Sequence, residues 1–210
     1  MQKGWFITFE GPDGSGKTTI STNVYQKLLT SGLDVIYTRE PGGIDIAEQI
    51  RGIILDPKNT AMDVKTEALL YAASRRQHLV EKVLPAIQAG KIVICDRFVD
   101  SSLAYQGVGR GIGIEEVLSI NEFAIEGYYP DVTLFLDIDP IEGLKRISNR
   151  HYRDRLDREA EDFHLKVALG YQEVLKRYRH RMQVLDANRP VEEIVNEAVQ
   201  YILAKVKPSV

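Results

Sequence analysis

Short apolar runs alternate along this chain with longer segments in which apolar residues recur at helical spacing. The short runs predict β-strands and the longer segments predict helices, because the two kinds of element differ in length and in hydrophobic period. The expected strands cover residues 5–9, 34–38, 92–95, 132–137 and 183–185, and the expected helices lie near 18–31, 44–55, 64–89, 114–127, 140–150, 160–180 and 190–206. This alternation favours an α/β fold, a five-stranded parallel sheet with helices on both faces.

Several of the expected strands are followed directly by polar or glycine-rich residues. In open parallel sheets, ligands bind beyond the carboxyl ends of the strands. That rule brings together the loop at 11–18, the pair Arg39-Glu40, the pair Asp96-Arg97 and the loop at 186–189. The sequence therefore places a candidate site at this edge of the sheet before any residue is given a role.

The loop at positions 11–18 reads GPDGSGKT and fits the phosphate-binding pattern GxxxxGK[ST]. It lies between the first expected strand and the first expected helix, which is the setting that such a loop requires. Its glycines let backbone N–H groups turn toward an anion, and the helix N-terminus adds partial positive charge. Lys17 can reach the β- and γ-phosphates, and the Thr18 hydroxyl can bind Mg²⁺. A glycine-rich turn with a solvated lysine is the alternative, but a P-loop NTPase is predicted.

Composition and charge narrow the class of protein. The 210 residues fit one domain, with 44% apolar and 27% charged residues, and the net charge of −3 gives no basic field for nucleic acid or an anionic membrane. Because the chain has only one cysteine, Cys95, a disulfide framework within the chain is excluded. Cys95 lies in an apolar run and is expected to be buried. No apolar run approaches the roughly 20 residues that span a bilayer, and the first strand leaves no room for a signal peptide. We expect a cytoplasmic enzyme.

Asp96 and Arg97 directly follow the third expected strand. A carboxylate at this place in a P-loop fold holds Mg²⁺, often through water. The neighbouring arginine can neutralise charge on a transferring phosphoryl group. A plain acid–base pair on the surface is the alternative.

Two further segments carry groups that can recognise a nucleotide. Ser102 and Gln106 are four residues apart on one side of a helical turn, and a glutamine amide can pair with the edge of a base. Tyr71 and Arg75 share one face of a long expected helix, so an aromatic ring and a guanidinium can meet a base together. A solvated, capped turn explains the first pair equally well, and core packing of Tyr71 with a solvated Arg75 explains the second.

Residues 145–158 are rich in arginine although the chain is acidic overall. Between two helices, such a segment is typical of a mobile lid that closes over phosphates, excludes water and supplies an arginine to the reaction. A solvated helix face and an RNA-contacting patch are the alternatives.

These motifs together resemble the bacterial thymidylate kinases over essentially the whole chain. The resemblance rests on FEGPDGSGKTT at 9–19, TREPGG at 38–43, and the segment at 96–106 with its DRF and SSLAYQ parts. It implies a nucleoside monophosphate kinase with a lid, which transfers the γ-phosphoryl group of ATP to dTMP and forms dTDP and ADP with Mg²⁺. Typical members are homodimers, and the helices near 64–89 and 114–127 can supply the interface. A kinase for another nucleotide or nucleoside and a nucleotide-dependent switch remain as other interpretations; the chain lacks the guanine-reading Asn-Lys-x-Asp motif of GTPase switches.

The resemblance also implies roles for individual residues. Tyr71 stacks on thymine, Arg75 and Gln106 read its polar edge, Arg51 and Arg97 hold the dTMP phosphate, Tyr105 lies against the 2′ position, and Asp13 lies near the 3′-hydroxyl and the metal. The acceptor site further includes Glu40, Pro41 and Ser102, and Thr18 and Asp96 hold the metal. The ATP site comprises Gly11, Pro12, Asp13, Gly14, Ser15, Gly16, Lys17, Thr18, Arg146 and Asn188.

The source of the catalytic arginine is a separate question. One branch of the family carries a basic residue inside the phosphate loop, whereas this chain has Asp13 and Ser15 there. The resemblance therefore implies that a lid at about 146–160 supplies the arginine. Arg150, Arg153 and Arg155 compete for this role, and Arg153 is the preferred candidate beside Lys17, Asp96 and Arg97.

Overall fold

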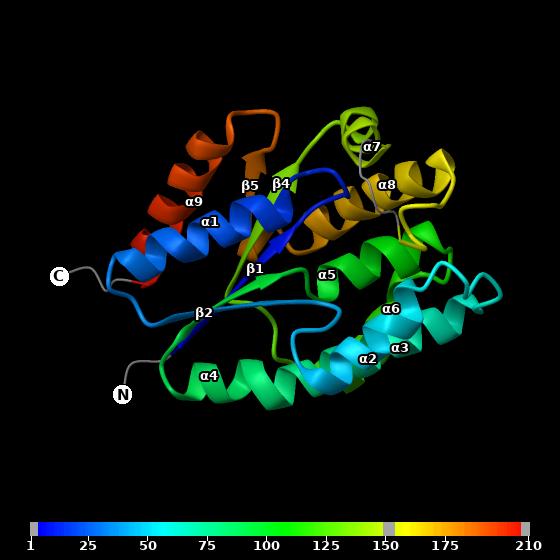
Figure 1. Ribbon diagram of the computed structural model, residues 1–210, viewed down its shortest axis with the longest axis horizontal. Coiled ribbons are helices and arrows are strands. Elements are labelled where there is room, and N and C mark those ends of the chain that lie inside the picture. Colours follow the sequence, from blue (N-terminus) through cyan, green and yellow to red (C-terminus); the bar gives the residue numbers. More distant parts are fainter. Residues whose placement is uncertain (1–3, 149–153, 207–210) are drawn as a thin grey trace.

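The computed structural model describes residues 4–148 and 154–206. In this part of the chain, five parallel strands form one sheet in the order β2-β3-β1-β4-β5 (Figure 1). The strands are β1 (Trp5–Glu10), β2 (Val35–Arg39), β3 (Ile92–Asp96), β4 (Val132–Asp137) and β5 (Met182–Asp186). The α/β fold and the five parallel strands predicted from the sequence are confirmed.

Helices cover both faces of the sheet, as expected for strands that are apolar on both sides. One face packs against α1 (Lys17–Thr30) and α9 (Val191–Val206). The other packs against α3 (Val64–His78), η1 (Leu79–Val83), α4 (Leu84–Gln88) and α6 (Ile114–Ile125), and farther along against α8 (Glu161–Arg177). The remaining helical elements are α2 (Asp45–Leu55), α5 (Val99–Ser102), η2 (Leu103–Gly109), α7 (Pro140–Ser148) and η3 (Arg179–Arg181). Within the described residues, none of these helices is long and apolar enough to cross a membrane.

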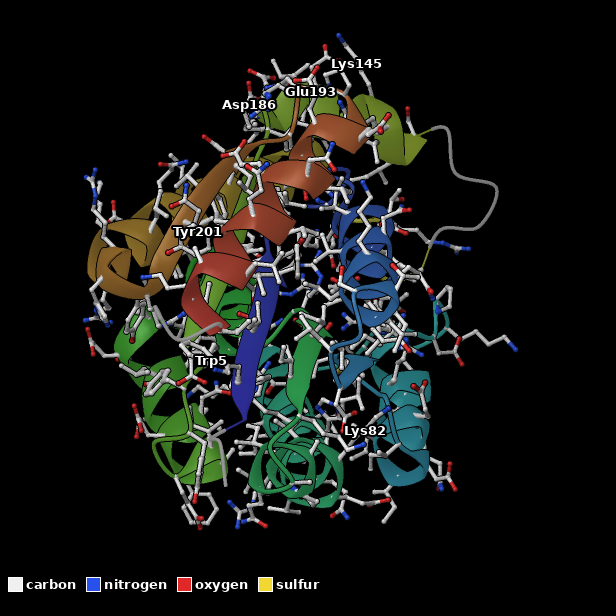
Figure 2. All side chains as sticks on the ribbon, turned by 90° about the vertical axis from the view of Figure 1, so that its left-hand side faces the viewer. Trp5, Lys82, Lys145, Asp186, Glu193 and Tyr201 are labelled. Atoms are coloured by element: carbon white, nitrogen blue, oxygen red, sulfur yellow. The ribbon has the colours of Figure 1, made fainter. Side chains whose placement is uncertain are left out.

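The register of the strands brings the polar residues at their carboxyl ends to one edge. Asp96 at the end of β3 is paired with Phe9 of β1 on one side and with Arg39 of β2 on the other. Figure 2 shows the two ends of the sheet, with Trp5 at its amino edge and Asp186 at its carboxyl edge. The phosphate loop follows β1, the central strand, so it lies among the ends of its neighbours.

Two helical elements differ from the sequence expectation. The helix expected at 64–89 runs through Gln88 but contains one π-helical turn, η1, just before Pro85. Because proline has no N–H and its ring crowds the preceding turn, the wider turn accommodates it. A second helical stretch, α5 with η2, spans Val99–Gly109 and was not among the expected helices. At the start of this stretch, the N–H groups of Phe98 and Ser101 donate to Glu10 of β1, a partner that the local sequence does not reveal.

Candidate active site

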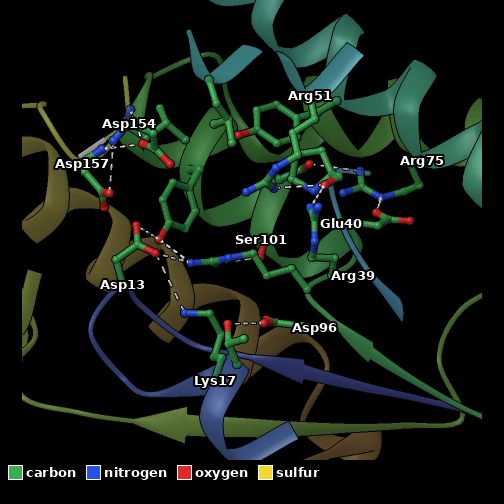
Figure 3. A pocket seen from close by; sticks show the side chains of 18 of the residues that line it. Asp13, Lys17, Arg39, Glu40, Arg51, Arg75, Asp96, Ser101, Asp154 and Asp157 are labelled. Carbon is green, nitrogen blue, oxygen red and sulfur yellow. Dashed lines mark hydrogen bonds and ion pairs between the residues drawn. The ribbon is translucent and has the colours of Figure 1, made fainter. Parts of the chain in front are cut away.

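A cavity of about 290 Å³ opens at the carboxyl edge of the sheet (Figure 3). Its walls come from the phosphate loop, the β2–α2 connection, α2, α3, the β3–α5 connection, η2 and residues 154–157. Most of the residues predicted for the site line it: Asp13, Gly14, Gly16, Lys17, Thr18, Glu40, Pro41, Arg51, Tyr71, Arg75, Asp96, Arg97, Ser102, Tyr105 and Gln106. Segments far apart in the sequence therefore converge on one space.

The phosphate loop holds its lysine in place by its own backbone. Gly14 and Gly16 have φ values of 81° and 84°, which glycine adopts without strain. The Lys17 ammonium donates to the Pro12 carbonyl at 2.8 Å and to Ser15 Oγ at 3.4 Å. Burial, and then the positive charge of Arg97, lowers the pKa of Lys17 to about 8. The lysine is thus charged at neutral pH and poorly solvated, a state that favours exchange of its loop contacts for an anion.

Thr18 and Asp96 form the candidate metal site. Thr18 Oγ1 donates to Asp96 Oδ2 at 2.6 Å, which turns the lone pairs of the hydroxyl away from the carboxylate. The other carboxylate oxygen, Asp96 Oδ1, is buried and has no hydrogen-bond partner within residues 4–148 and 154–206. A buried acceptor of this kind is costly unless a cation or a donor satisfies it. The pair therefore fits a Mg²⁺ ion, which prefers oxygen ligands.

Arg97 connects the phosphate loop with residues of α5, η2 and α8. It has a φ of 71°, an uncommon value for a residue other than glycine. One guanidinium nitrogen, Nη2, donates to Asp13 and to the Tyr105 hydroxyl, and Tyr105 in turn donates to Asp13 Oδ2 at 2.6 Å. The other nitrogen, Nη1, donates to the hydroxyls of Ser101 at 3.0 Å and Tyr171 at 2.9 Å. These contacts fix a cation beside the loop.

Two more arginines meet at the carbonyl of Pro41. Arg39 Nη1 donates to this oxygen at 2.8 Å and Arg51 Nη1 at 3.0 Å. Arg39 is also paired with Glu48, whereas burial and the charge of Arg39 lower the pKa of Arg51. This corner of the cavity has an excess of positive charge, which suits a phosphate group.

Tyr71, Arg75 and Gln106 form another wall of the cavity. Arg75 is 2% exposed, and four of its five N–H groups donate to fixed protein acceptors, so among the described residues one N–H has no partner. Those acceptors are Glu40 Oε2, Ser102 Oγ, Asn121 Oδ1 and the Phe98 carbonyl. The guanidinium is therefore rigid and buried, so the alternative of a solvated Arg75 is wrong.

Some predicted residues lie elsewhere. Asn188 lines a second cavity beside α8 and bonds Asp186. Arg146 on α7 donates to the carbonyls of Gly14 at 3.3 Å and Ala187 at 3.5 Å, so it lies over the phosphate loop. Gly11, Pro12 and Ser15 form the body of the loop and do not line the first cavity.

The lid arginines fall into two groups. Arg150 and Arg153 lie outside the described residues. Arg155 is 9% exposed and donates to the Ile54 carbonyl at 2.7 Å and to Glu67. Arg155 thus anchors the segment at 154–157 to α2 and α3, and its guanidinium is committed to protein partners.

Three further residues shape the cavity or hold its walls, although no role was predicted for any of them from the sequence: Arg39, Glu67 and Glu10. Arg39 lies at the end of β2, where the strand-end rule indicated the segment without a role for this side chain. Glu67 lies four residues before Tyr71 on α3, so the helical spacing, which places both residues on one face, was the only signal in the sequence that could have indicated it. Glu10 binds Phe98 N at 2.7 Å and Ser101 Oγ at 2.6 Å and thereby holds the turn that carries Arg97.

Comparisons with known proteins agree with this geometry. The family model for thymidylate kinase matches residues 9–198. A thymidylate kinase of Clostridium novyi (strain NT) is 59% identical over 204 residues, which cover 96% of this chain and 100% of that protein. One of Bacillus velezensis is 58% identical over 206 residues, 97% of each chain. The crystal structure of thymidylate kinase from Ehrlichia chaffeensis superposes with a TM-score of 0.77 at 33% identity, covering 95% of this chain and 98% of that one. The chain belongs to the thymidylate kinase family.

Proposed function

We propose that this enzyme transfers the γ-phosphoryl group of ATP to dTMP and so forms ADP and dTDP on the route to dTTP. The observation that carries the proposal is that one and the same cavity has the phosphate loop at one end and Tyr71 with Gln106 at the other. Arg97 lies between these ends, next to Asp13 of the loop. Such an arrangement accepts two nucleotides whose phosphates meet at Arg97.

The donor side holds the phosphates of ATP. The N–H groups of the loop and the α1 N-terminus face the phosphates, and Lys17 moves from the Pro12 carbonyl to the β- and γ-phosphates. Mg²⁺ would be held by the Thr18 hydroxyl and the unpaired oxygen of Asp96, and when bound it would neutralise charge on the phosphates. Arg146, over the loop, is placed to contact the nucleotide beyond the phosphates.

The acceptor side holds dTMP by groups that the protein has already positioned. Arg51 and Arg97 bind its phosphate, and Tyr71 stacks on its base while Gln106 and the free N–H of Arg75 read the polar edge. The Tyr105 ring lies against the sugar and favours a deoxyribose, and Asp13 accepts from the 3′-hydroxyl. The rigidity of these side chains lowers the entropy lost on binding.

The chain needs no strong general base for this reaction. A phosphate monoester has its second pKa at about 6, so the attacking oxygen of dTMP is largely deprotonated at pH 7. The protein aligns this oxygen with the γ-phosphorus, and Lys17 and Arg97 offset the charge that spreads over the transferring group. We assign the remaining cation to the lid. Arg155 is bound to Glu67 and Ile54, which leaves Arg150 and Arg153, and Arg153 is our candidate. We also propose that the enzyme acts in the cytoplasm as a homodimer.

The test is a phosphoryl-transfer assay with ATP, Mg²⁺ and a panel of nucleoside monophosphates and nucleosides. We expect dTMP to be the best acceptor by a wide margin, and Lys17→Ala to lower kcat/KM by about 10³-fold or more. A better rate with another monophosphate or with a nucleoside would select the other kinase interpretation. Nucleotide binding without transfer to any acceptor would select a switch.

A further inference from the structure

The side-chain amide of Gln106 is held by a carboxylate behind the cavity wall. Gln106 is 1% exposed, and its Nε2 donates to Glu67 Oε1 at 2.9 Å. Glu67 is also 1% exposed and accepts from Arg110 at 3.2 and 3.0 Å and from Arg155. The Gln106 amide is therefore one of three donors to a single buried carboxylate.

Glu67 is ionised at neutral pH and can only accept hydrogen bonds. Burial alone raises its pKa, but the hydrogen bonds from Arg110 and Gln106 and the charge of Arg110 outweigh burial and leave the pKa below its usual value. An ionised carboxylate repels the carbonyl oxygen of an amide and binds its N–H. The Gln106 amide must therefore turn its nitrogen toward Glu67 and its oxygen away.

This orientation decides what the cavity offers to a base. No donor among the described residues bonds Gln106 Oε1, and Gln106 lines the cavity. A held amide presents its oxygen and its second N–H, which match the N3–H and a carbonyl of thymine. Cytosine has an acceptor at N3 and an amino group at C4, so it matches the same amide only after a flip of 180°.

We propose that Glu67 is a positioning residue for base selection: it locks the Gln106 amide in the orientation that accepts a keto base with an N3–H and rejects cytosine. The inference rests on the proposed function, because it requires Gln106 to meet the base of the acceptor. Arg75 acts in the same sense, since its remaining N–H donates to a carbonyl and opposes an amino group.

The experiment compares kcat/KM for dTMP and dCMP in the wild-type enzyme and in Glu67→Gln. A glutamine at this position can donate or accept, so it supports either orientation of the Gln106 amide. We expect the dTMP:dCMP ratio of kcat/KM to fall by about tenfold, the scale of one well-placed pair of base contacts. Part of the preference remains because Arg75 is unchanged.

Two further variants separate orientation from support of the fold. Glu67→Asp keeps the charge for both arginines but withdraws the carboxylate by one methylene, beyond reach of Gln106; its ratio is expected to fall as well, and it decides the question if Glu67→Gln does not fold. Arg110→Lys disturbs the same buried cluster but keeps the contact between Glu67 and Gln106, so its stability should fall while its ratio stays at the wild-type value.

The outcomes are distinct. A wild-type enzyme that does not prefer dTMP refutes the proposed function itself. A wild-type preference that survives unchanged in the folded Glu67 variants overturns the role of Glu67, as does an equal loss of activity toward both nucleotides. A lower ratio in the Glu67 variants but not in Arg110→Lys supports it.

Discussion

The charge of Lys17 is the residue property most open to measurement. Burial and the positive charge of Arg97 lower the pKa of this lysine from 10.5 to about 8, although Asp13 and Asp96 favour the charged form. In the free enzyme the ammonium is therefore present at pH 7 and is lost as the pH rises through about 8. Since kcat/KM reports ionisations of the free enzyme and free substrate, kcat/KM for ATP should fall on an alkaline limb near pH 8.

Lys17→Arg provides the control, because a guanidinium keeps its charge far above this range. The variant is expected to be less active, but its alkaline limb should leave the range near pH 8. If the limb stays at the same pH in Lys17→Arg, another group is responsible for it.

The predictability of single residues depends on how local their geometry is. The sequence was enough to identify Lys17, Thr18 and Asp96, because their positions follow from short local segments: a glycine-rich loop between a strand and a helix, and the end of an apolar strand. The partners of Arg155 could not, since its guanidinium meets Ile54 and Glu67 across about a hundred residues of chain. Its membership of an arginine-rich segment suggested a ligand contact, whereas burial makes it an anchor.

At the scale of elements, α7 packs on the phosphate loop with no side chain between them. A Cβ added to Gly143 would lie 2.7 Å from the backbone oxygen of Asp13, and one added to Gly14 would lie 2.2 Å from the oxygen of Gly143. Both distances are shorter than any normal contact, so only glycine fits on either side. The same contact places Arg146, one turn farther along α7, over the loop.

Gly143→Ala should therefore push α7 away from the loop. Overpacking of this kind costs roughly 1–3 kcal/mol, so thermal unfolding should shift downward by a few degrees. Because Arg146 moves with the helix, the KM for ATP should rise about tenfold, which corresponds to ~1.4 kcal/mol, while the KM for dTMP changes little. Steady-state kinetics with each substrate varied in turn measure this difference.

Gly52→Ala is the matched control for a glycine within a helix. Apart from the neighbouring backbone of α2 itself, no atom of the described residues lies within 4 Å of a Cβ at this position, and alanine favours a helix by about 1 kcal/mol over glycine. This variant should be as stable as the wild type or more so, with an unchanged KM for ATP. Equal KM values for ATP in Gly143→Ala and the wild type would contradict the role of the close contact.

The elements themselves could largely be predicted from hydrophobic pattern, with two instructive differences. The strands were found because each is a short, mainly apolar run bounded by turn residues. The helical stretch from Val99 to Gly109 was not, since its serines and glycines favour turns and its first N–H groups depend on Glu10. The π-helical turn before Pro85 was not predicted either. It lets a long helix that packs on the sheet continue past a proline.

At the scale of the whole molecule, α3 and α6 leave large apolar side chains in solvent. Phe123 of α6 is 88% exposed and Leu69 of α3 is 55% exposed. The two helices touch each other through the bond from Arg76 to the Ala124 carbonyl. Leu69 is in the same helix as Tyr71 and Arg75, which line the cavity and belong to the proposed dTMP site. A partner bound at Leu69 would therefore hold a helix that also forms the cavity.

If this surface joins two copies by a two-fold axis, each residue occurs twice in the interface. Burial of one phenylalanine contributes about 1.5–3 kcal/mol, so Phe123→Glu removes this contribution twice and also brings two carboxylates together. The variant should be monomeric at micromolar concentrations where the wild type is a dimer, as measured by sedimentation equilibrium.

Leu169→Glu on α8 is the control: it replaces a residue that is 64% exposed and should leave the dimer intact. A monomeric wild type would exclude the homodimer, and a dimeric Phe123→Glu would move the interface away from α6. If dimerisation supports α3, the monomeric variant should show its defect in the KM for dTMP rather than in the KM for ATP, since α3 contributes to the proposed dTMP site and not to the phosphate loop.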